Sequence, residues 1–512
     1  MLVASLVADA VPFDRLSLLF VGGLVGLALW ELASVIWAAA AAWPALEAER
    51  GLIYAAAAAA LVLVVRPDRV ASLVIGIVAG TTFVAIYALA TRVFPEHLGG
   101  PHDPIGGNQL AAPIGYWNAL GQLLVFGLLL GAGLVFHGGT KLRVFAGGAL
   151  VPLGVALYLT FSRGAIVALL VGIVVLAFTE RAIAARLKVL LPGSRLVAGT
   201  ALVAVAAVAL VAVAREGGPS AAADRALQGF REEAPPASGD LNRRLLSVSG
   251  HGRADYWRVA ARMVEREPLL GEGAGGFERR WMQERSAPNN ARDAHNLYLE
   301  TLAELGPVGL ALLLVALIAP LAALRRARHA ALAPAAAAAY AAFLVHAAVD
   351  WDWELPVLVL PALACGAILL AEARSSPPMA LTTPYRALGV SAAVLAIAVA
   401  IVANVGNRAL AESALALEHG DTRGAAESAR RAQAWAPWSH EPWQLLGEAQ
   451  LAARQDAAAR RSLAEAIQRA PEEWRLWFDL AIVSDAPRAR VAITRASELN
   501  PLGDEVRDLE RR

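Results

Sequence analysis

Residues 249–314 read SGHGRADYWRVAARMVEREPLLGEGAGGFERRWMQERSAPNNARDAHNLYLETLAELGPVGLALLL, and the rest of the chain is interpreted around them. The first part has the spacing of an amphipathic helix, and a glycine-rich turn and a polar loop follow. A second helix is predicted to begin near Ala294-His295-Asn296 and to continue, after a break at Gly306-Pro307, into an apolar run. A water-facing segment is therefore predicted within a chain that otherwise lies in a membrane.

The overall composition is that of a helical membrane protein. Of the 512 residues, 57% are hydrophobic, and the mean hydropathy is +0.52. Repeated apolar runs approach the roughly 20 residues that a helix needs to cross a bilayer. The formal net charge of +1 provides no global field to attract nucleic acid. The single cysteine, Cys365, excludes an internal disulfide framework and a multi-cysteine metal site.

The apolar runs predict an all-α polytopic fold with about eleven to twelve transmembrane helices. The eleven expected spans are 16–37, 51–65, 70–91, 113–136, 144–161, 165–178, 196–214, 305–324, 330–349, 355–370 and 388–405. The first run is too long for a signal-peptide core and is expected to remain as a span.

The positions of Lys and Arg in the short loops predict the orientation. They concentrate in alternate connections, at Arg66 and Arg69, at Lys141 and Arg143, at Arg181, Arg186, Lys188 and Arg195, at Arg325, Arg326 and Arg328, and at Arg374 and Arg386. These connections and the amino terminus are expected to face the cytoplasm. The large loop 215–294, the Ser162-Arg163-Gly164 turn, residues 350–354 and the carboxyl terminus are then expected to face outward.

A soluble domain is predicted after the last span. The distances from Pro437 to Pro471 and from Trp443 to Trp477 both equal 34 residues, which is the tetratricopeptide period. The chain is thus predicted to divide into a membrane domain, 1–406, and a tetratricopeptide helical solenoid, 407–512. The concave face of such a solenoid usually binds a protein partner.

Arg253 stands at the start of a predicted helix over residues 253–266. Trp257, Ala260 and Val264 follow at helical spacing, and such a helix can lie flat on the outer leaflet. A solvated arginine on a loop helix explains the same pattern. Nearby alternatives to Arg253 are Arg243, Arg244 and Arg258. The glycines between residues 271 and 276 follow no predicted strand, so they indicate a tight turn and not a dinucleotide site.

Arg163 and His295 are further candidates for chemistry. An arginine between two spans is costly to keep near hydrocarbon, which favours a functional role, and its planar guanidinium suits phosphate oxygens. His295 follows a possible helix cap at Asp293 and can exchange protons near neutral pH, although a lone histidine is more often structural.

Acidic residues offer weaker hypotheses. Asp350 and Asp352 have the D-x-D spacing of some metal sites, but the interleaved Trp351 and Trp353 fit an interfacial aromatic belt, and Asp350 can equally pair with an arginine. Glu31, inside the first span, is a possible proton-relay or partner carboxylate.

Several of these residues lie in motifs that resemble the O-antigen ligase and polymerase superfamily. The matching stretches are Pro113-Ile-Gly-Tyr-Trp-Asn-Ala-Leu-Gly121, Phe161-Ser-Arg-Gly164, Gly252-Arg253 through Trp257, Pro268-Leu-Leu-Gly-Glu-Gly273, Ala294-His-Asn-Leu-Tyr-Leu-Glu300 and Glu304-Leu-Gly306. The resemblance implies that Arg163 and Arg253 contact a carrier diphosphate and that His295 acts on the acceptor. The expected catalytic set is His295, Arg163 and Arg253, and the expected substrate-binding set is Arg163, Arg253, Arg258, Asn296 and Asp350.

The function expected from this resemblance is metal-independent, inverting glycan transfer from an undecaprenyl-diphosphate carrier to a lipid, glycan or protein acceptor, without a cofactor. It would take place at the outer face of the bacterial inner membrane. Ligase, polysaccharide polymerase and protein oligosaccharyltransferase activities remain open. The alternative from another class is an envelope polysaccharide transporter or a non-catalytic assembly scaffold.

Overall fold

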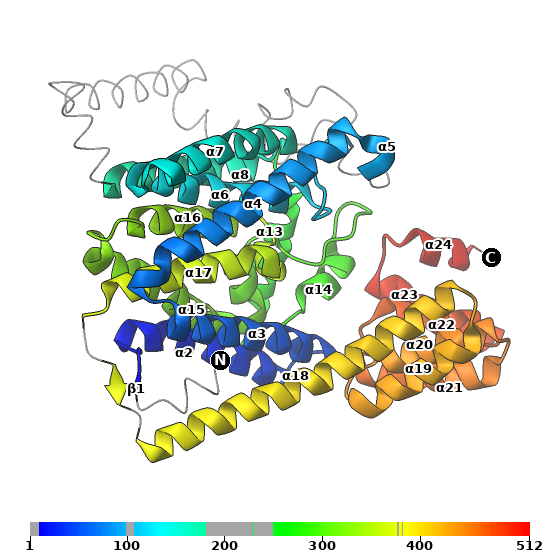
Figure 1. The fold of residues 1–512 in the computed structure, drawn as a ribbon. Helices are drawn as coiled ribbons and strands as arrows, with labels where there is room; N and C mark the ends of the chain where they lie inside the picture. The colour runs from blue at the N-terminus through cyan, green and yellow to red at the C-terminus, as the bar shows by residue number, and fades with distance from the viewer. Residues whose placement is uncertain are drawn as a thin grey trace.

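The chain folds almost wholly into helices, as Figure 1 shows. The computed structural model describes residues 10–98, 107–180, 228, 249–375, 378–380 and 382–511. Within these residues the sheet structure is one antiparallel pair of two-residue strands, β1 (Ala10–Val11) and β2 (Met379–Ala380). The protein is thus an all-α membrane protein, as its composition predicts.

Ten helices make up the apolar part of the fold. They are α2 (Arg15–Ala33), α3 (Ala42–Val64), α4 (Val70–Val93), α6 (Trp117–His137), α7 (Thr140–Thr160), α8 (Arg163–Thr179), α15 (Leu297–Ala327), α16 (Ala333–His346), α17 (Pro356–Ala373) and α18 (Thr383–Glu418). Seven helices in the described ranges are long and apolar enough to cross a membrane, and α8 and α16 are apolar but shorter. Helix α3 is in neither group, because three charged residues, Glu47, Glu49 and Arg50, lie within it. Each of the ten overlaps a predicted span. The remaining predicted span, 196–214, lies outside the described residues.

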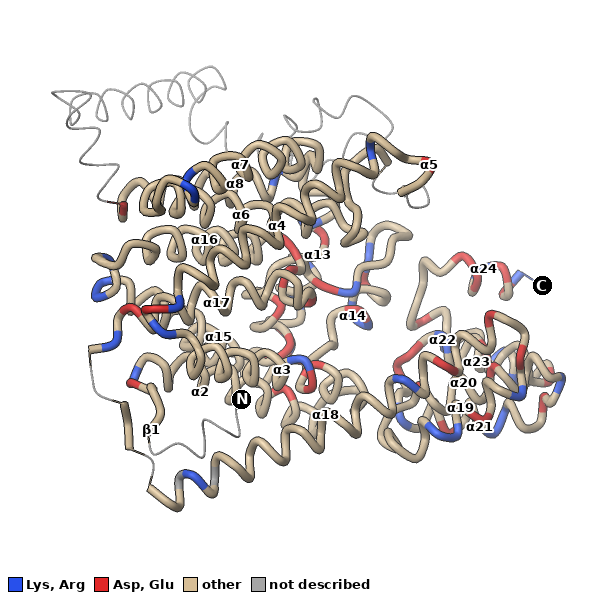
Figure 2. Tube along the Cα trace, viewed as in Figure 1, with Lys and Arg blue, Asp and Glu red and all other residues tan. Residues whose placement is uncertain are grey.

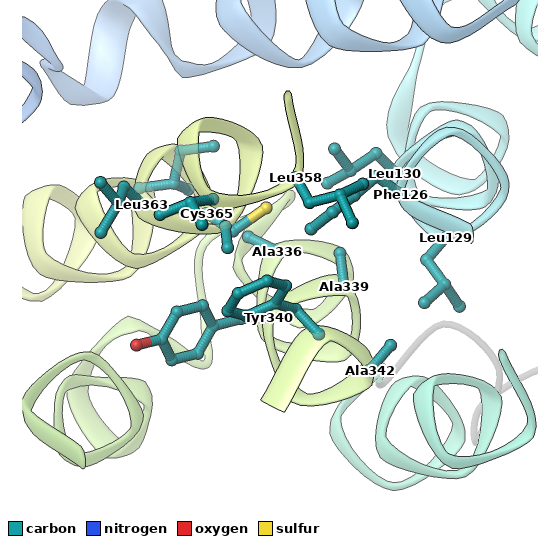
Figure 3. Close-up of a cluster of buried hydrophobic side chains, with 14 of the residues drawn as sticks. Phe126, Leu129, Leu130, Ala336, Ala339, Tyr340, Ala342, Leu358, Leu363 and Cys365 are labelled. Atoms are coloured by element: carbon teal, nitrogen blue, oxygen red, sulfur yellow. The ribbon is translucent and has the colours of Figure 1, made fainter. Parts of the chain in front are cut away.

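The centre of the bundle is built around α16, whose many alanines allow neighbouring helices to approach closely. Figure 3 shows Ala336 and Ala339 of α16 close to side chains of α6 and α17, whereas the Tyr340 hydroxyl points towards α15 and donates to the Leu317 carbonyl at 3.1 Å. The ring centroids of Phe126 and Phe343 lie 6.2 Å apart. A side chain at Gly133 would place its Cβ 2.5 Å from that of Ala335, so the α6–α16 contact requires glycine there.

The connections gather at the two ends of the bundle. At one end, Arg374 donates to the Val62 carbonyl at 2.7 Å, and His137 contacts Glu180 at 2.7 Å. At the other end, the Leu297 amide donates to the Ala347 carbonyl at 2.9 Å. Figure 2 shows charged residues concentrated towards these ends, with uncharged helix between them. This separation matches the two sets of loops in the predicted topology.

The water-facing segment contains α13 (Arg253–Arg266) and α14 (Phe277–Glu284). Helix α13 has the predicted bounds, but its apolar face is covered by protein. Its buried residues pack in one cluster with Phe277 and Trp281, and the rings of Tyr256 and Trp281 lie 4.7 Å apart. The prediction that this face lies on the leaflet is therefore wrong, because α14 and the start of α15 occupy that position.

The glycine-rich stretch forms the expected tight turn against α15. Gly271, Gly273 and Gly306 all have positive φ, and the Gly273 amide donates to the Glu304 carbonyl at 2.9 Å. An added Cβ at Gly306 would lie 2.2 Å from the Leu269 carbonyl oxygen. This contact fixes the break in α15, which separates its polar first turns from the apolar span.

The carboxyl-terminal part consists of short helices that pack in succession. They are α19 (Thr422–Trp435), α20 (Glu441–Ala452), α21 (Asp456–Arg469), α22 (Trp474–Ile482), α23 (Ala486–Leu499) and α24 (Asp504–Glu510). Helix α18 continues through the predicted domain boundary at residue 406. Trp474 and Leu499 join the α13–α14 cluster, and Arg285 donates to the Asn500 side chain at 2.6 Å. The two predicted domains thus share a packed contact.

A buried ion pair at this contact leads to a stability prediction. The Arg279 side chain is 6% exposed and binds Glu272 at 2.8 Å, and it also pairs with Glu472, which is 36% exposed. We expect Glu272→Ala to lower the free energy of unfolding by about 3–5 kcal/mol, because it leaves a buried guanidinium without its main partner.

The matched variant Glu472→Ala removes only the exposed partner and should cost less than about 1 kcal/mol. Thermal unfolding of the full chain in detergent measures both. Equal costs for the two variants would show that the buried pair does not secure this contact.

Candidate active site

A cavity of about 500 Å³ opens at one end of the membrane helices. Its walls come from the start of α6 and the residues before it, the start of α8, residues 249–253, His295 and the segment after α16. Arg163, Arg253 and His295 all line it. The structure thus brings together the three residues predicted to be catalytic, from three separate parts of the chain.

Arg163 is the first residue of α8. The preceding Ser162 caps the helix by accepting from the Ala165 amide at 3.2 Å. The Arg163 guanidinium donates to the Ser249 carbonyl at 2.7 Å. Because the amino-terminal end of a helix carries partial positive charge, α8 adds to the positive potential at this wall. Both features suit a phosphate group.

Arg253 is held by a network around Asp350. Its Nη2 donates to Asp350 Oδ2 at 2.8 Å. Tyr116 donates to Asp350 Oδ1 at 2.7 Å, and Asn118 donates to Oδ2 at 2.7 Å. Arg253 Nε also donates to the carbonyl of Val349. The guanidinium is therefore fixed before any substrate arrives, as electrostatic catalysis requires.

The charge state of Asp350 follows from this pairing. Burial raises the pKa of Asp350, but the opposing effects of Arg253, of nearby histidines and of the Tyr116 hydrogen bond bring it below its ordinary value. Asp350 is thus ionised at neutral pH. The structure confirms the alternative that Asp350 pairs with an arginine. Asp350 does not itself line the cavity that contains Arg163 and His295. It therefore affects that cavity by positioning Arg253.

His295 has a defined orientation. Its φ is 55°, in the left-handed region, and its Nδ1 lies 3.0 Å from the Asp293 carbonyl oxygen. A carbonyl only accepts, so Nδ1 carries the proton and Nε2 of the neutral ring has a lone pair. Burial lowers the pKa of His295, with a smaller opposing effect from Asp350. The ring is therefore suited to accept a proton at Nε2.

Two predicted substrate contacts lie elsewhere. Arg258 is about half exposed and pairs with Asp255, and it does not line the cavity. The Asn296 side chain caps α15 by accepting from the Leu299 amide at 3.1 Å. The prediction that Asp293 is the cap is wrong, because α15 begins at Leu297 and the cap directly precedes it. The alternatives Arg243 and Arg244 lie outside the described residues.

Sequence reasoning missed the residues that support the arginines. Tyr116 and Asn118 lie in a quoted motif, but their contact with Asp350 spans more than 230 residues and has no signal in local spacing. Asp352 already has a partner, since His346 Nδ1 lies 2.6 Å from its Oδ2 and both side chains are fully buried. The two aspartates thus have separate partners, which disfavours the D-x-D metal hypothesis.

The fold and cavity together define a helical membrane protein with a prearranged cationic site at one end of its bundle. A family model described as O-antigen ligase matches residues 148–314. The matched range includes Arg163, Arg253 and His295. The match supports a relation to the O-antigen ligase superfamily and, at a coarse level, an enzyme that transfers glycans. No curated protein matches the chain.

Proposed function

We propose that this protein catalyses inverting, metal-independent glycan transfer from a polyprenyl-diphosphate carrier, such as undecaprenyl diphosphate, to an acceptor at the outer face of a bacterial inner membrane. The observation that carries the proposal is the convergence of Arg163, Arg253 and His295 on one cavity. The match to the O-antigen ligase family covers the same three residues.

The proposed reaction uses each residue in a distinct way. As the bond between the sugar C1 and the phosphate oxygen breaks, negative charge develops on the leaving diphosphate. Arg163 and Arg253 stabilise this charge from fixed positions. His295 Nε2 takes the proton of the acceptor hydroxyl while its oxygen bonds to C1 from the opposite face. The products are the inverted glycoside and the carrier diphosphate.

The acceptor distinguishes a ligase from a polymerase or a protein oligosaccharyltransferase. We propose that α19–α24 form a tetratricopeptide domain, 407–512, that binds a protein partner or acceptor next to the membrane domain, 1–406. The alternative is a transporter or scaffold. A transporter usually places its charged groups near the bilayer midplane, whereas Arg163, Arg253 and His295 lie at one end of the bundle.

A deletion strain provides the direct test. We expect it to accumulate the lipid-linked glycan, and the surface polymer or glycoprotein that disappears identifies the acceptor class. Complementation with Arg163→Ala should fail although the variant inserts normally. Full complementation by this variant would support the scaffold alternative.

Topology is tested with reporter fusions. A reporter after Arg512 should be active outside the cytoplasm, and one after Arg328 should be active inside, because the arginine-rich loops among the described residues join helix ends opposite the cavity. Cytoplasmic activity after Arg512 would contradict an outward-facing site.

The independence from metal is tested with purified enzyme in excess chelator, at a temperature at which it stays folded. Single-turnover transfer should fall by less than about tenfold, because fixed arginines stabilise the leaving group. An abolished reaction that manganese or magnesium restores would make the chemistry metal-dependent.

A further inference from the structure

A cluster of carboxylates lies next to the catalytic cavity. Asp293, Glu300 and Glu354 each present an oxygen, and these three atoms lie within 4.8 Å of one another. They come from the loop before His295, from the first turn of α15 and from the short helix η3 (Asp352–Glu354) before α17. Figure 2 shows acidic residues concentrated between α3 and α13.

The surrounding charges do not neutralise this cluster. Further carboxylates, those of Glu31, Glu47 and Glu304, line the same small cavity or the hollow beside it. The positive groups that line the two hollows are Arg50, which pairs with both Glu47 and Glu354, together with Arg292 and Arg475. Ten carboxylates and three guanidinium groups thus line the two hollows.

Glu31 gives an independent indication that something binds here. Its side chain is only 6% exposed, and its Oε2 has no hydrogen-bond partner among the described residues. Together with Glu300 and Glu354 it lines a cavity of about 40 Å³, which exceeds the space that one water needs. A Cβ at Gly51 would lie 2.5 Å from Glu31 Oε2, so glycine at this position leaves room for the carboxylate.

Buried carboxylates that lie close together repel one another, and a hard cation relieves this cost by supplying positive charge and accepting oxygen ligands. Calcium takes oxygen ligands at about 2.3–2.6 Å, so ligands of one ion lie at most about 5.2 Å apart, and the three cluster oxygens, all within 4.8 Å of one another, meet this limit. Magnesium usually keeps several waters and binds only one or two carboxylates, so a set of three protein carboxylates favours calcium. The all-carboxylate ligand set excludes a preference for soft metals.

We propose that Asp293, Glu300 and Glu354 bind a hard divalent cation, calcium in preference to magnesium, with Glu31 beside it. The bound cation joins the loop that carries His295 to the segment that carries Asp350, the partner of Arg253. It stabilises the frame of the catalytic cavity and takes no part in bond breaking. This site does not depend on the proposed glycan transfer.

Terbium luminescence of the full chain in detergent tests the site directly. Trp353 lines the same small cavity, so terbium bound there should emit when tryptophan is excited. Calcium should displace terbium and quench the emission, and magnesium should do so at a concentration at least about tenfold higher. Absence of sensitised emission would overturn the proposal.

Variants test whether the terbium that emits is bound at this cluster. The double variant Asp293→Asn, Glu300→Gln should bind terbium at least about tenfold more weakly, since two of three charged ligands are lost. Glu441→Gln is the matched control, because it removes a carboxylate from the neighbouring hollow and leaves the cluster intact. Unchanged emission in a folded double variant would place the bound ion elsewhere and overturn the proposal.

Thermal unfolding gives a second readout. Calcium should raise the midpoint of the wild type and of Glu441→Gln by at least about 2 °C relative to chelator, and the double variant should show no rise. Identical midpoints of the wild type in calcium and in chelator would indicate that protons, and not a cation, neutralise the cluster. This outcome would leave the glycan-transfer proposal untouched.

Discussion

Replacement of Arg163 by lysine is expected to slow single-turnover glycan transfer by about 10²- to 10³-fold. Lysine keeps the charge but loses the planar fork that binds two phosphate oxygens. Its single nitrogen also cannot reproduce the spread of the guanidinium, one nitrogen of which contacts the Ser249 carbonyl. The measurement uses purified variants with a lipid-linked donor, after confirming membrane insertion.

A matched control comes from Arg258, which the sequence also placed in the substrate site. Arg258→Lys should change the rate by less than about threefold, because Arg258 pairs with Asp255 outside the cavity and an exposed pair contributes little. A near-normal rate for Arg163→Lys would assign Arg163 to membrane anchoring and would leave the diphosphate to Arg253 alone.

Much of the membrane fold was predictable because hydrocarbon imposes a simple rule on the sequence. A span needs enough apolar residues and internal hydrogen bonds. This rule identified even α16, in which most side chains are alanine. The rule could not predict how α13 packs, because the same sequence pattern gives an apolar helix face whether lipid or protein covers it. The position of Trp281 decides between the two.

The catalytic residues were predictable for a different reason. Arg163 and His295 stand at helix starts, where polar side chains next to apolar runs are conspicuous, and the family resemblance strengthened both. The residues that fix Arg253 carry a weaker signal. Asp350 was predicted as a possible partner of an arginine, but its contacts with Tyr116 and Asn118 form only through the tertiary fold. The charge cluster of Asp293, Glu300 and Glu354 was missed for the same reason.

His295 shows how one backbone angle changes a local prediction. A helix running from residue 294 would place Asp293 at the cap, as expected from sequence. The positive φ of His295 instead turns the chain, so Asn296 becomes the cap and the Asp293 carbonyl is free to accept from His295 Nδ1. The same turn that displaces the cap therefore orients the imidazole.

That orientation gives the prediction with the largest expected effect. We expect His295→Ala to slow transfer by about 10²- to 10⁴-fold, because the acceptor hydroxyl loses its base. Donor binding should change by less than about threefold, since the arginines remain and the imidazole acts on the acceptor. Equilibrium binding of the carrier lipid and single-turnover transfer measure the two quantities separately.

His251→Ala is the matched control for this substitution. His251 lines the same cavity and also has a positive φ, of 51°, so alanine introduces the same backbone strain at both positions. A general disturbance of the cavity would therefore slow both variants alike. A base at residue 295 predicts a large loss for His295→Ala and a loss of less than about tenfold for His251→Ala. Near-normal transfer by His295→Ala would remove it as the base, and the arginines alone would then have to activate the donor enough for an unassisted hydroxyl to attack.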